Sequence, residues 1–269
     1  MSDISIIAWS WGAAAAVFVA VLWPLSVLRR DASVVDFWWG PGAAVMVLTA
    51  WTLAGGPTGL HALALVALIG TWGLRLGLTL GARRLRETAE DPRYAELRRA
   101  WDPGFRWKSL FVVFALQALL QGLVALGALA GVLAETSVPT ALAGLGVAAA
   151  VGGLALEAAA DRQLDRFKTA APAGALCREG LRRHLRFPHY SGEMLFWAGV
   201  AAVAFDAGVI WAPLPALLVA LLVTKVSGAP MLDEHLARTR PEHAEWKAAT
   251  PAFVPDLRAL GAAARRARG

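Results

Sequence analysis

The chain has 269 residues, of which 57% are hydrophobic and 17% are charged, and its formal net charge is +6. Its mean hydropathy is +0.52. Stretches of about 20 apolar residues recur along its length, which excludes an ordinary soluble domain and predicts an all-α, polytopic membrane protein. The single cysteine, Cys177, excludes an internal disulfide and a cysteine metal cluster.

Seven apolar ranges predict transmembrane helices. The first range ends in Arg29-Arg30 and lacks a basic leader, which indicates a retained helix and not a cleaved signal peptide. The whole chain, 1–269, is expected to form a single transmembrane domain. The seven ranges are 4–28, 38–54, 60–81, 109–133, 139–160, 191–206 and 210–229.

The basic residues are distributed unevenly between the two sides of these ranges. Of the 26 lysines and arginines, only Arg75 and Lys225 fall inside a range. The turns at 55–59, 134–138 and 206–208 contain neither residue, whereas the segments on the other side are basic. Because lysine and arginine mark cytoplasmic loops, we expect the N-terminus outside and the C-terminus in the cytoplasm. The location of the basic residues on the cytoplasmic side of the membrane explains the positive net charge, and no nucleic-acid partner is expected.

Two polar segments outside the apolar ranges predict surface helices. Asp91-Pro92 predicts a helix start, after which Tyr94, Leu97 and Trp101 fall on one face. We expect an amphipathic helix on the inner membrane surface. The segment 238–255 has a similar pattern.

Small and polar residues inside the apolar ranges predict contacts between helices. Gly73, Gly77 and Gly81 recur every four residues and form a flat stripe that lets a neighbouring helix approach closely. Gln117 and Gln121 are also four residues apart, and we expect both to form interhelical hydrogen bonds.

Ionisable residues within a span are costly in lipid, so each needs a partner or a function. Asp36 lies at the start of the second range, and two interpretations of it are possible, a helix cap at the interface and a functional carboxylate. Arg75 either snorkels to the headgroups or faces a polar cavity. Glu157 and Asp161 are four residues apart at the inner end of the fifth range, which places both carboxylates on one helical face.

The segment GLRRHLRFPHYSGE (180–193) leads from clustered arginines into the sixth range. Pro188 predicts a helix start, and the N-terminus of a helix favours anions. The arrangement suits a phosphate-bearing ligand that approaches from the cytoplasm. A metal site is not expected, because the five histidines are too few for a membrane di-iron centre. The residues around this helix start are Arg182, Arg183, Arg186, His189, Tyr190 and Glu193.

Seven sequence blocks, in this order, resemble the steroid 5α-reductase-like membrane proteins, and more closely the bacterial branch of that family. The superfamily also includes the isoprenylcysteine carboxyl methyltransferases. The resemblance spans nearly the whole chain and is most specific around 180–193. The blocks are SVVDFWWG (33–40), LRLGLTLGARR (74–84), DPRYAELRRAW (91–101), LEAAADRQLDRFK (156–168), GLRRHLRFPHYSGE (180–193), SGAPMLDEHLARTRP (227–241) and TPAFVP (250–255).

The resemblance implies seven transmembrane helices in a bacterial inner membrane, with a periplasmic N-terminus and a catalytic pocket open to the cytoplasm. It implies an NADPH-dependent reduction of a carbon–carbon double bond conjugated to a carbonyl. The substrate would be an apolar enone, steroid-like or an enoyl lipid. A cofactor that carries several phosphates needs arginines and lysines on the cytoplasmic side, which agrees with the charge distribution.

The resemblance also implies roles for individual residues. At the substrate end, Asp36 and Trp72 stand where the reductases have a glutamate and a tyrosine that polarise the carbonyl oxygen. A buried carboxyl is pushed toward its neutral form and can then donate a hydrogen bond to that oxygen. The residues expected on the cofactor are Arg75, Asp161, Lys168, Arg183, Arg186, His189, Tyr190, Glu193 and His235.

Two other functions remain open at this stage. The first is a membrane methyltransferase that uses S-adenosylmethionine, which the superfamily allows and whose cofactor has no phosphate. The second is a non-catalytic membrane protein that binds lipid.

Overall fold

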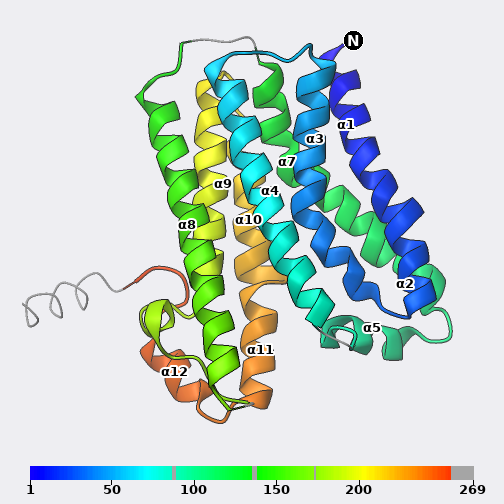
Figure 1. Cartoon of the computed structure of the whole chain (residues 1–269), viewed down its shortest axis with the longest axis vertical. Coiled ribbons are helices and arrows are strands. Elements are labelled where there is room, and N and C mark those ends of the chain that lie inside the picture. Colours follow the sequence, from blue (N-terminus) through cyan, green and yellow to red (C-terminus); the bar gives the residue numbers. More distant parts are fainter. Residues whose placement is uncertain (87–88, 135–137, 173, 256–269) are drawn as a thin grey trace, which may run out of the picture. The chain divides into compact units, whose positions relative to one another are not determined.

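The computed structural model describes residues 1–86, 89–134, 138–172 and 174–255, and these residues are mostly helical (Figure 1). They form two compact units. Unit 1 comprises Met1–Val147 and Val200–Pro215, and unit 2 comprises Ala148–Gly199 and the chain from Ala216 onward. Most of the expected turn at 134–138, and the basic tail after residue 255, lie outside the described residues.

The helices of unit 1 follow the first four apolar ranges and the predicted surface helix. Two of the long apolar helices contain a π-helical turn, η1 and η3, and a 3₁₀ segment, η2, precedes α3. The elements are α1 (Asp3–Val17), η1 (Phe18–Leu22), α2 (Trp23–Arg29), η2 (Ala32–Trp38), α3 (Trp39–Leu53), α4 (Leu60–Arg86), α5 (Pro92–Trp101), α6 (Phe105–Ser109), η3 (Leu110–Ala115) and α7 (Leu116–Leu133).

The remaining helices belong wholly or largely to unit 2. The helix predicted to start at Pro188 does start there, and the segment 238–255 forms a short helix as expected. The elements are α8 (Ala141–Ala170), η4 (Gly180–Arg183), α9 (Pro188–Asp206), α10 (Pro213–Leu221), η5 (Leu222–Val226), α11 (Ala229–Thr239) and α12 (His243–Ala249).

The chain is a membrane protein, because five helical stretches in its described part are long and apolar enough to cross a bilayer. The other two predicted spans are helical as α3 and α9. However, α3 has only 15 residues, and α9 carries His189, Glu193 and Asp206. The total of seven spans and the orientation of the termini stay predictions. The five stretches are Asp3–Arg29, Leu60–Arg86, Phe105–Leu133, Ala141–Ala170 and Pro213–Thr239.

The helices α3 and α4 lie side by side in unit 1 (Figure 1). A Cβ atom on Gly73 would lie 2.4 Å from the carbonyl oxygen of Gly40, and one on Gly77 would lie 2.5 Å from Cγ of Pro41. Nothing lies within 4 Å of such an atom on Gly81. The predicted glycine stripe is therefore confirmed at two of its three positions, where it brings the two backbones together.

The core of unit 1 holds η2 and α5 against the first and fourth apolar helices. Val35 of η2 and Tyr94 of α5 are buried in one cluster with large aromatic side chains such as Phe18 and Phe114. Leu97 and Trp101 pack against the same cluster. The predicted apolar face of α5 is therefore confirmed, and this core positions the two elements that carry the polar groups of the site.

A different polar cluster in unit 1 joins α4, the end of α9 and the residue before α8. His61 of α4 is buried, and its Nε2 lies 2.8 Å from Oδ2 of Asp206 at the end of α9. The backbone N–H of Thr140 donates to the same carboxylate oxygen at 3.0 Å. This pairing explains how the histidine is accommodated in the interior.

In unit 2, α8 and α9 meet at two glycines. A Cβ atom on Gly153 would lie 2.5 Å from the carbonyl oxygen of Gly192, and one on Gly192 would lie 2.6 Å from that of Gly153. Glu157 is buried one turn further along α8, where its Cγ would be 2.8 Å from the Gly192 Cβ atom. This crossing brings the acidic end of α8 beside the start of α9.

Candidate functional site

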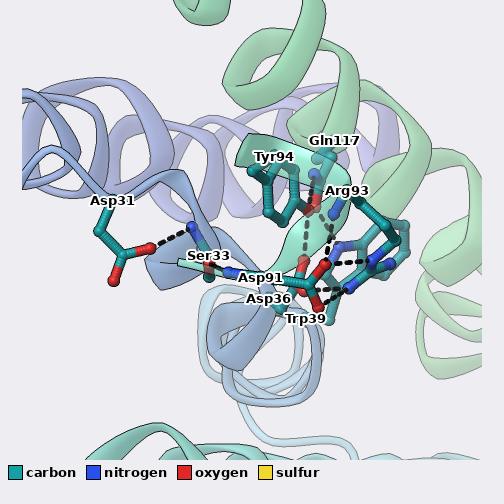
Figure 2. Close-up of polar contacts among 8 residues, drawn as sticks. All are labelled: Asp31, Ser33, Asp36, Trp39, Asp91, Arg93, Tyr94 and Gln117. Carbon is teal, nitrogen blue, oxygen red and sulfur yellow. Dashed lines mark hydrogen bonds and ion pairs between the residues drawn. The ribbon is translucent and has the colours of Figure 1, made fainter. Parts of the chain in front are cut away.

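Asp36 lies in η2 and has hydrogen-bond partners on α5. Figure 2 shows the Tyr94 hydroxyl and the Arg93 guanidinium directed at its carboxylate. Tyr94 Oη donates to Asp36 Oδ1 at 2.6 Å, and Arg93 Nη2 donates to Oδ2 at 2.8 Å. The Asp36 side chain is 28% exposed, whereas Tyr94 is 8% exposed. The Asp36 side chain is therefore partly exposed, whereas the tyrosine beside it is buried.

Short polar contacts between residues 31–33 and 90–91 hold η2 against the start of α5. The backbone N–H of Asp91 donates to Ser33 Oγ at 2.7 Å, and that of Ala32 donates to Glu90 Oε1 at 2.7 Å. Asp31 Oδ1 accepts from Ser33 N at 2.9 Å. Asp91 also caps α5 by accepting from the N–H of Arg93, as the Asp-Pro start predicted. These contacts fix the position of Asp36 relative to Tyr94.

The acidic groups around Asp36 differ in how their charge is compensated. Asp31 forms an ion pair with Arg84. Glu90 binds Arg98 through both carboxylate oxygens, at 2.8 and 3.0 Å. Arg93, by contrast, binds both Asp36 and Asp91. One guanidinium thus contacts two carboxylates, of Asp36 and Asp91.

Burial dominates the electrostatics of Asp36. Burial raises the pKa of the Asp36 carboxyl, against the opposing effects of the Arg93 charge and the Tyr94 hydrogen bond. Burial and the adjacent Asp36 carboxylate raise the pKa of Tyr94 well above its usual range. Burial acts against the charge of Arg93, but its hydrogen bond to Asp91 and the Asp36 charge raise its pKa on balance. Tyr94 therefore remains a protonated donor, while Asp36 holds a proton more readily than an ordinary aspartate.

A second layer of polar side chains stands behind Tyr94. Gln117 of α7 donates from Nε2 to Tyr94 Oη at 3.0 Å, and Trp39 Nε1 donates to Gln117 Oε1 at 2.6 Å (Figure 2). One turn later, Gln121 Nε2 donates to the carbonyl oxygens of Trp38 and Trp39, both at 2.9 Å. The predicted interhelical hydrogen bonds of Gln117 and Gln121 are thus confirmed.

The other two predicted residues of unit 1 lie on α4. Trp72 is buried and Arg75 is half-buried one turn further on. Within the described chain, the hydrogen-bond partners of Asp36 are Arg93 and Tyr94. A tyrosine therefore stands beside the carboxyl group, and it comes from α5. The roles of Trp72 and Arg75 stay predictions.

Unit 2 contains a pocket of about 290 Å³ that joins two of the predicted cofactor residues, Lys168 and His235. Arg182 and Arg240 line the same pocket, together with apolar side chains such as Phe167. None of its described lining residues is acidic. The pocket thus presents basic side chains from α8, η4, α11 and the residue after α11, and its lysine and arginines suit an anionic ligand.

Arg186 lies in a different part of unit 2, beside a second pocket of about 450 Å³. Its guanidinium forms an ion pair with Asp233, and its Nε donates to the carbonyl oxygen of Thr250 at 3.1 Å. Asp233 also binds His243 and Lys247, each at 3.1 Å. Arg186 is buried, and its charge is compensated within the fold, so it holds α9, α11 and α12 together. Its contact with a cofactor stays a prediction.

The remaining predicted residues lie along the α8–α9 crossing or at the surface. Asp161 on α8 is half-buried, as are His189, Tyr190 and Glu193 on the first turns of α9. The His189 and Tyr190 rings are 4.0 Å apart between centroids. Arg183 is exposed.

Comparison with known proteins places most of the chain in one family. The family model described as "Protein of unknown function (DUF1295)" matches residues 22–250. The chain belongs to the DUF1295 family. No curated protein and no solved structure matches it. In this DUF1295 protein the matched range contains every predicted site residue, from Asp36 to His235.

The sequence did not identify four residues that the structure of this DUF1295 protein brings into the two sites. Tyr94 was recognised only as part of an apolar helix face, and Arg93 not at all. A hydroxyl on a buried face is a usable signal, because a buried tyrosine O–H requires a partner. Arg182 was noted near the helix start, but its place in the pocket with Arg240 depends on contacts between distant segments.

Proposed function

We propose that this DUF1295 protein is an NADPH-dependent membrane reductase of a carbon–carbon double bond conjugated to a carbonyl, in an apolar enone or enoyl lipid. The observation that carries the proposal is the pocket lined by Lys168, Arg182, His235 and Arg240 without a described acidic residue. Such a set of cations is suited to phosphate groups. Two of the four residues, Lys168 and His235, are also the ones expected on the cofactor from the family resemblance.

The size of the pocket fits one end of the cofactor. Sites for small molecules have volumes of roughly 300–1,000 Å³, and this pocket has about 290 Å³. The pocket is thus slightly smaller than a whole small-molecule site, so we assign to it only a phosphate-bearing ribose, with Lys168, Arg182 and Arg240 as the groups that would hold the phosphate. Bound NADPH supplies a hydride, and the protein has to orient it and exclude water.

Asp36 is the group we assign to the substrate carbonyl. Its side chain is partly exposed, and in the protonated form the carboxyl group can donate a hydrogen bond to an oxygen on which negative charge develops. Burial favours that protonated form. Tyr94 and Arg93 hold the carboxyl group in place from the opposite side.

The proposal includes a topology and a location. It adds α3 and α9 to the five long apolar stretches, which gives seven spans. The N-terminus is then in the periplasm and the C-terminus in the cytoplasm of a bacterial inner membrane. The lack of lysine and arginine in the turns at 55–59 and 206–208 supports this orientation. The partners are then membrane lipids and an apolar substrate.

The test is equilibrium binding of NADPH to the purified protein in detergent, followed by cofactor fluorescence. We expect binding by the parent protein and a loss of affinity of about tenfold or more in Lys168→Gln and in Arg240→Gln, since each removes a charge-assisted hydrogen bond. Arg166→Gln is the matched control, because Arg166 is exposed on the same helix and lines neither pocket. A folded protein that does not bind NADPH would refute the proposal.

The two alternative functions give different results in the same assay. A methyltransferase would bind S-adenosylmethionine, and Lys168→Gln would leave that affinity nearly unchanged because this cofactor has no phosphate. A non-catalytic lipid-binding protein would bind neither cofactor. The cationic pocket favours the reductase over both.

A further inference from the structure

Four side chains of unit 1 form a continuous chain of hydrogen bonds that ends on Asp36 (Figure 2). Trp39 Nε1 donates to Gln117 Oε1 at 2.6 Å, Gln117 Nε2 contacts Tyr94 Oη at 3.0 Å, and Tyr94 Oη contacts Asp36 Oδ1 at 2.6 Å. The four residues come from η2, α3, α5 and α7. They join elements that are distant in the sequence, and each bond has normal hydrogen-bond geometry.

The chemistry of the first residue fixes the direction of every bond in the chain. An indole N–H can only donate, so the amide oxygen of Gln117 must face Trp39. The amide nitrogen of Gln117 must then face Tyr94, whose oxygen has to accept. A phenol has one proton, and with its oxygen accepting from Gln117 that proton is directed to Asp36. The amide orientation of Gln117 is therefore determined by Trp39 and is not an arbitrary choice.

The chain is held rigidly at its start. Gln121, which is 2% exposed, binds the carbonyl oxygens of Trp38 and Trp39. A Cβ atom on Gly42 would lie 2.6 Å from the Gln121 amide nitrogen, so the two helices are in close contact at this point. The backbone that carries Trp39 is thereby fixed against α7.

We infer that Trp39 and Gln117 are positioning residues that set the direction of the Tyr94 proton toward Asp36. With Arg93 donating to the other carboxylate oxygen, Asp36 receives a donor on each oxygen. The ionised carboxylate then presents only acceptor sites to a ligand, and only the protonated carboxyl group can donate to a substrate oxygen. The catalytic use of this arrangement rests on the proposed function, whereas the direction of the chain does not.

The test is the ¹³Cζ resonance of Tyr94 at neutral pH in the purified protein, without cofactor or substrate. The chain has only two tyrosines, so Tyr190→Phe assigns the signal. Asp36→Asn removes the carboxylate acceptor and defines the shift expected when Tyr94 no longer donates to it. We expect Trp39→Phe to move the Tyr94 resonance in the same direction as Asp36→Asn, and we expect Gln117→Met, which provides no competing amide oxygen, to abolish this effect of Trp39→Phe in the double variant. In Trp39→Phe the amide is free to turn its oxygen to the tyrosine, which then has a competing acceptor.

Trp38→Phe is the matched control. Trp38 is the neighbouring residue, and its indole donates to the carbonyl oxygen of Ala14 at 3.2 Å, so it takes no part in the series of hydrogen bonds from Trp39 to Asp36. We expect it to lower the thermal midpoint to a similar extent as Trp39→Phe without moving the Tyr94 resonance. The inference is wrong if Trp39→Phe leaves the resonance in place, if its effect persists with Gln117→Met in the double variant, if Trp38→Phe moves the resonance equally, or if Asp36→Asn does not move it. Because no cofactor is used, failure of NADPH binding would leave this result unaffected.

Discussion

Asp36 in unit 1 and Lys168 in unit 2 lie in different electrostatic surroundings. The Asp36 carboxyl group is desolvated by burial and contacts the guanidinium of Arg93, which it shares with Asp91. The pocket of Lys168 has two arginines and a histidine, and none of its described lining residues is acidic. Burial raises the pKa of a carboxyl group, whereas a pocket lined by basic side chains attracts an anion. The comparison suggests how one apolar chain provides both a proton donor and a phosphate site.

The largest effect is expected where a buried cation of unit 2 loses its carboxylate partner, because the Lys168 pocket has no described acidic lining residue and Arg186 does have an acidic partner. Asp233→Asn leaves the buried guanidinium of Arg186 without its carboxylate and weakens the contacts to His243 and Lys247. Removal of one partner of a buried ion pair costs about 3–5 kcal/mol. We expect a loss of this size in the free energy of unfolding, measured by denaturant titration in detergent.

The neighbouring residue provides the control for that experiment. Glu234 is 67% exposed and forms an ion pair with Arg238 on the same helix. We expect Glu234→Gln to change the free energy of unfolding by less than about 0.5 kcal/mol, as for exposed pairs in general. Equal effects of the two substitutions would contradict the assignment of Arg186 to the fold.

Substitutions at the helix crossings test whether close backbone contacts at glycine pack the helices within each unit. Gly153→Ala places a methyl group 2.5 Å from the Gly192 carbonyl oxygen, and Gly73→Ala places one 2.4 Å from that of Gly40. Each should cost about 1–3 kcal/mol through overpacking, measured as a lower thermal midpoint. Gly152→Ala and Gly70→Ala are matched controls, because nothing lies within 4 Å of a Cβ atom at either position. A control that destabilises as much as its partner would argue against the close crossings.

Tyr94→Phe tests the hydrogen bonds around Asp36, and its expected effect on stability is smaller. It removes the donor to Asp36 and the acceptor for Gln117, and hydrogen bonds to charged groups contribute about 1.5–3 kcal/mol. We expect a loss of stability near the lower figure, and a further rise in the pKa of Asp36 because the Tyr94 hydrogen bond opposes that rise. Carboxyl ¹³C NMR of Asp36 across pH would measure the second effect. An unchanged or lower Asp36 pKa would show that Tyr94 does not support the ionised form.

The pH dependence of stability gives the smallest expected effect. Burial raises the pKa of Asp36 above its ordinary value of 3.8, so the folded protein holds this proton more tightly than the unfolded chain. The contribution to stability is then full below that value and is lost as pH rises through the folded pKa. The free energy of unfolding of the parent, relative to Asp36→Asn, should therefore fall over the pH interval above 3.8 in which Asp36 ionises in the folded protein. A parent that gains stability over this interval would reverse the sign assigned to Asp36.

Local patterns in the sequence were sufficient to predict the helices. All seven apolar ranges are helical, Asp91 caps α5 and Pro188 starts α9. Hydrophobic periodicity and proline positions determine these features within a few residues, and the structure mainly extends their ends. The helix α8, for example, continues ten residues past the predicted end at 160, through the charged segment that carries Lys168.

The pairing of charges could not be predicted in the same way. Asp36 and Tyr94 are 58 residues apart, and Arg186 and Asp233 are 47 apart. Which cation meets which carboxylate depends on the packing of distant helices, for which a single sequence contains no periodic signal. The resemblance to the reductases indicated Asp36 and, in the third span, Trp72 as the two residues at the substrate carbonyl. It gave no signal for a tyrosine that hydrogen-bonds to Asp36. The tyrosine beside Asp36 comes from the surface helix that follows that span.

The central claim is that the cations of unit 2 hold a phosphate-bearing cofactor, and a density map of the protein with NADPH would test it most directly. We predict phosphate density within hydrogen-bonding distance of Lys168, Arg182 and Arg240. Clear density for NADPH at another place, with this pocket empty, would contradict the account.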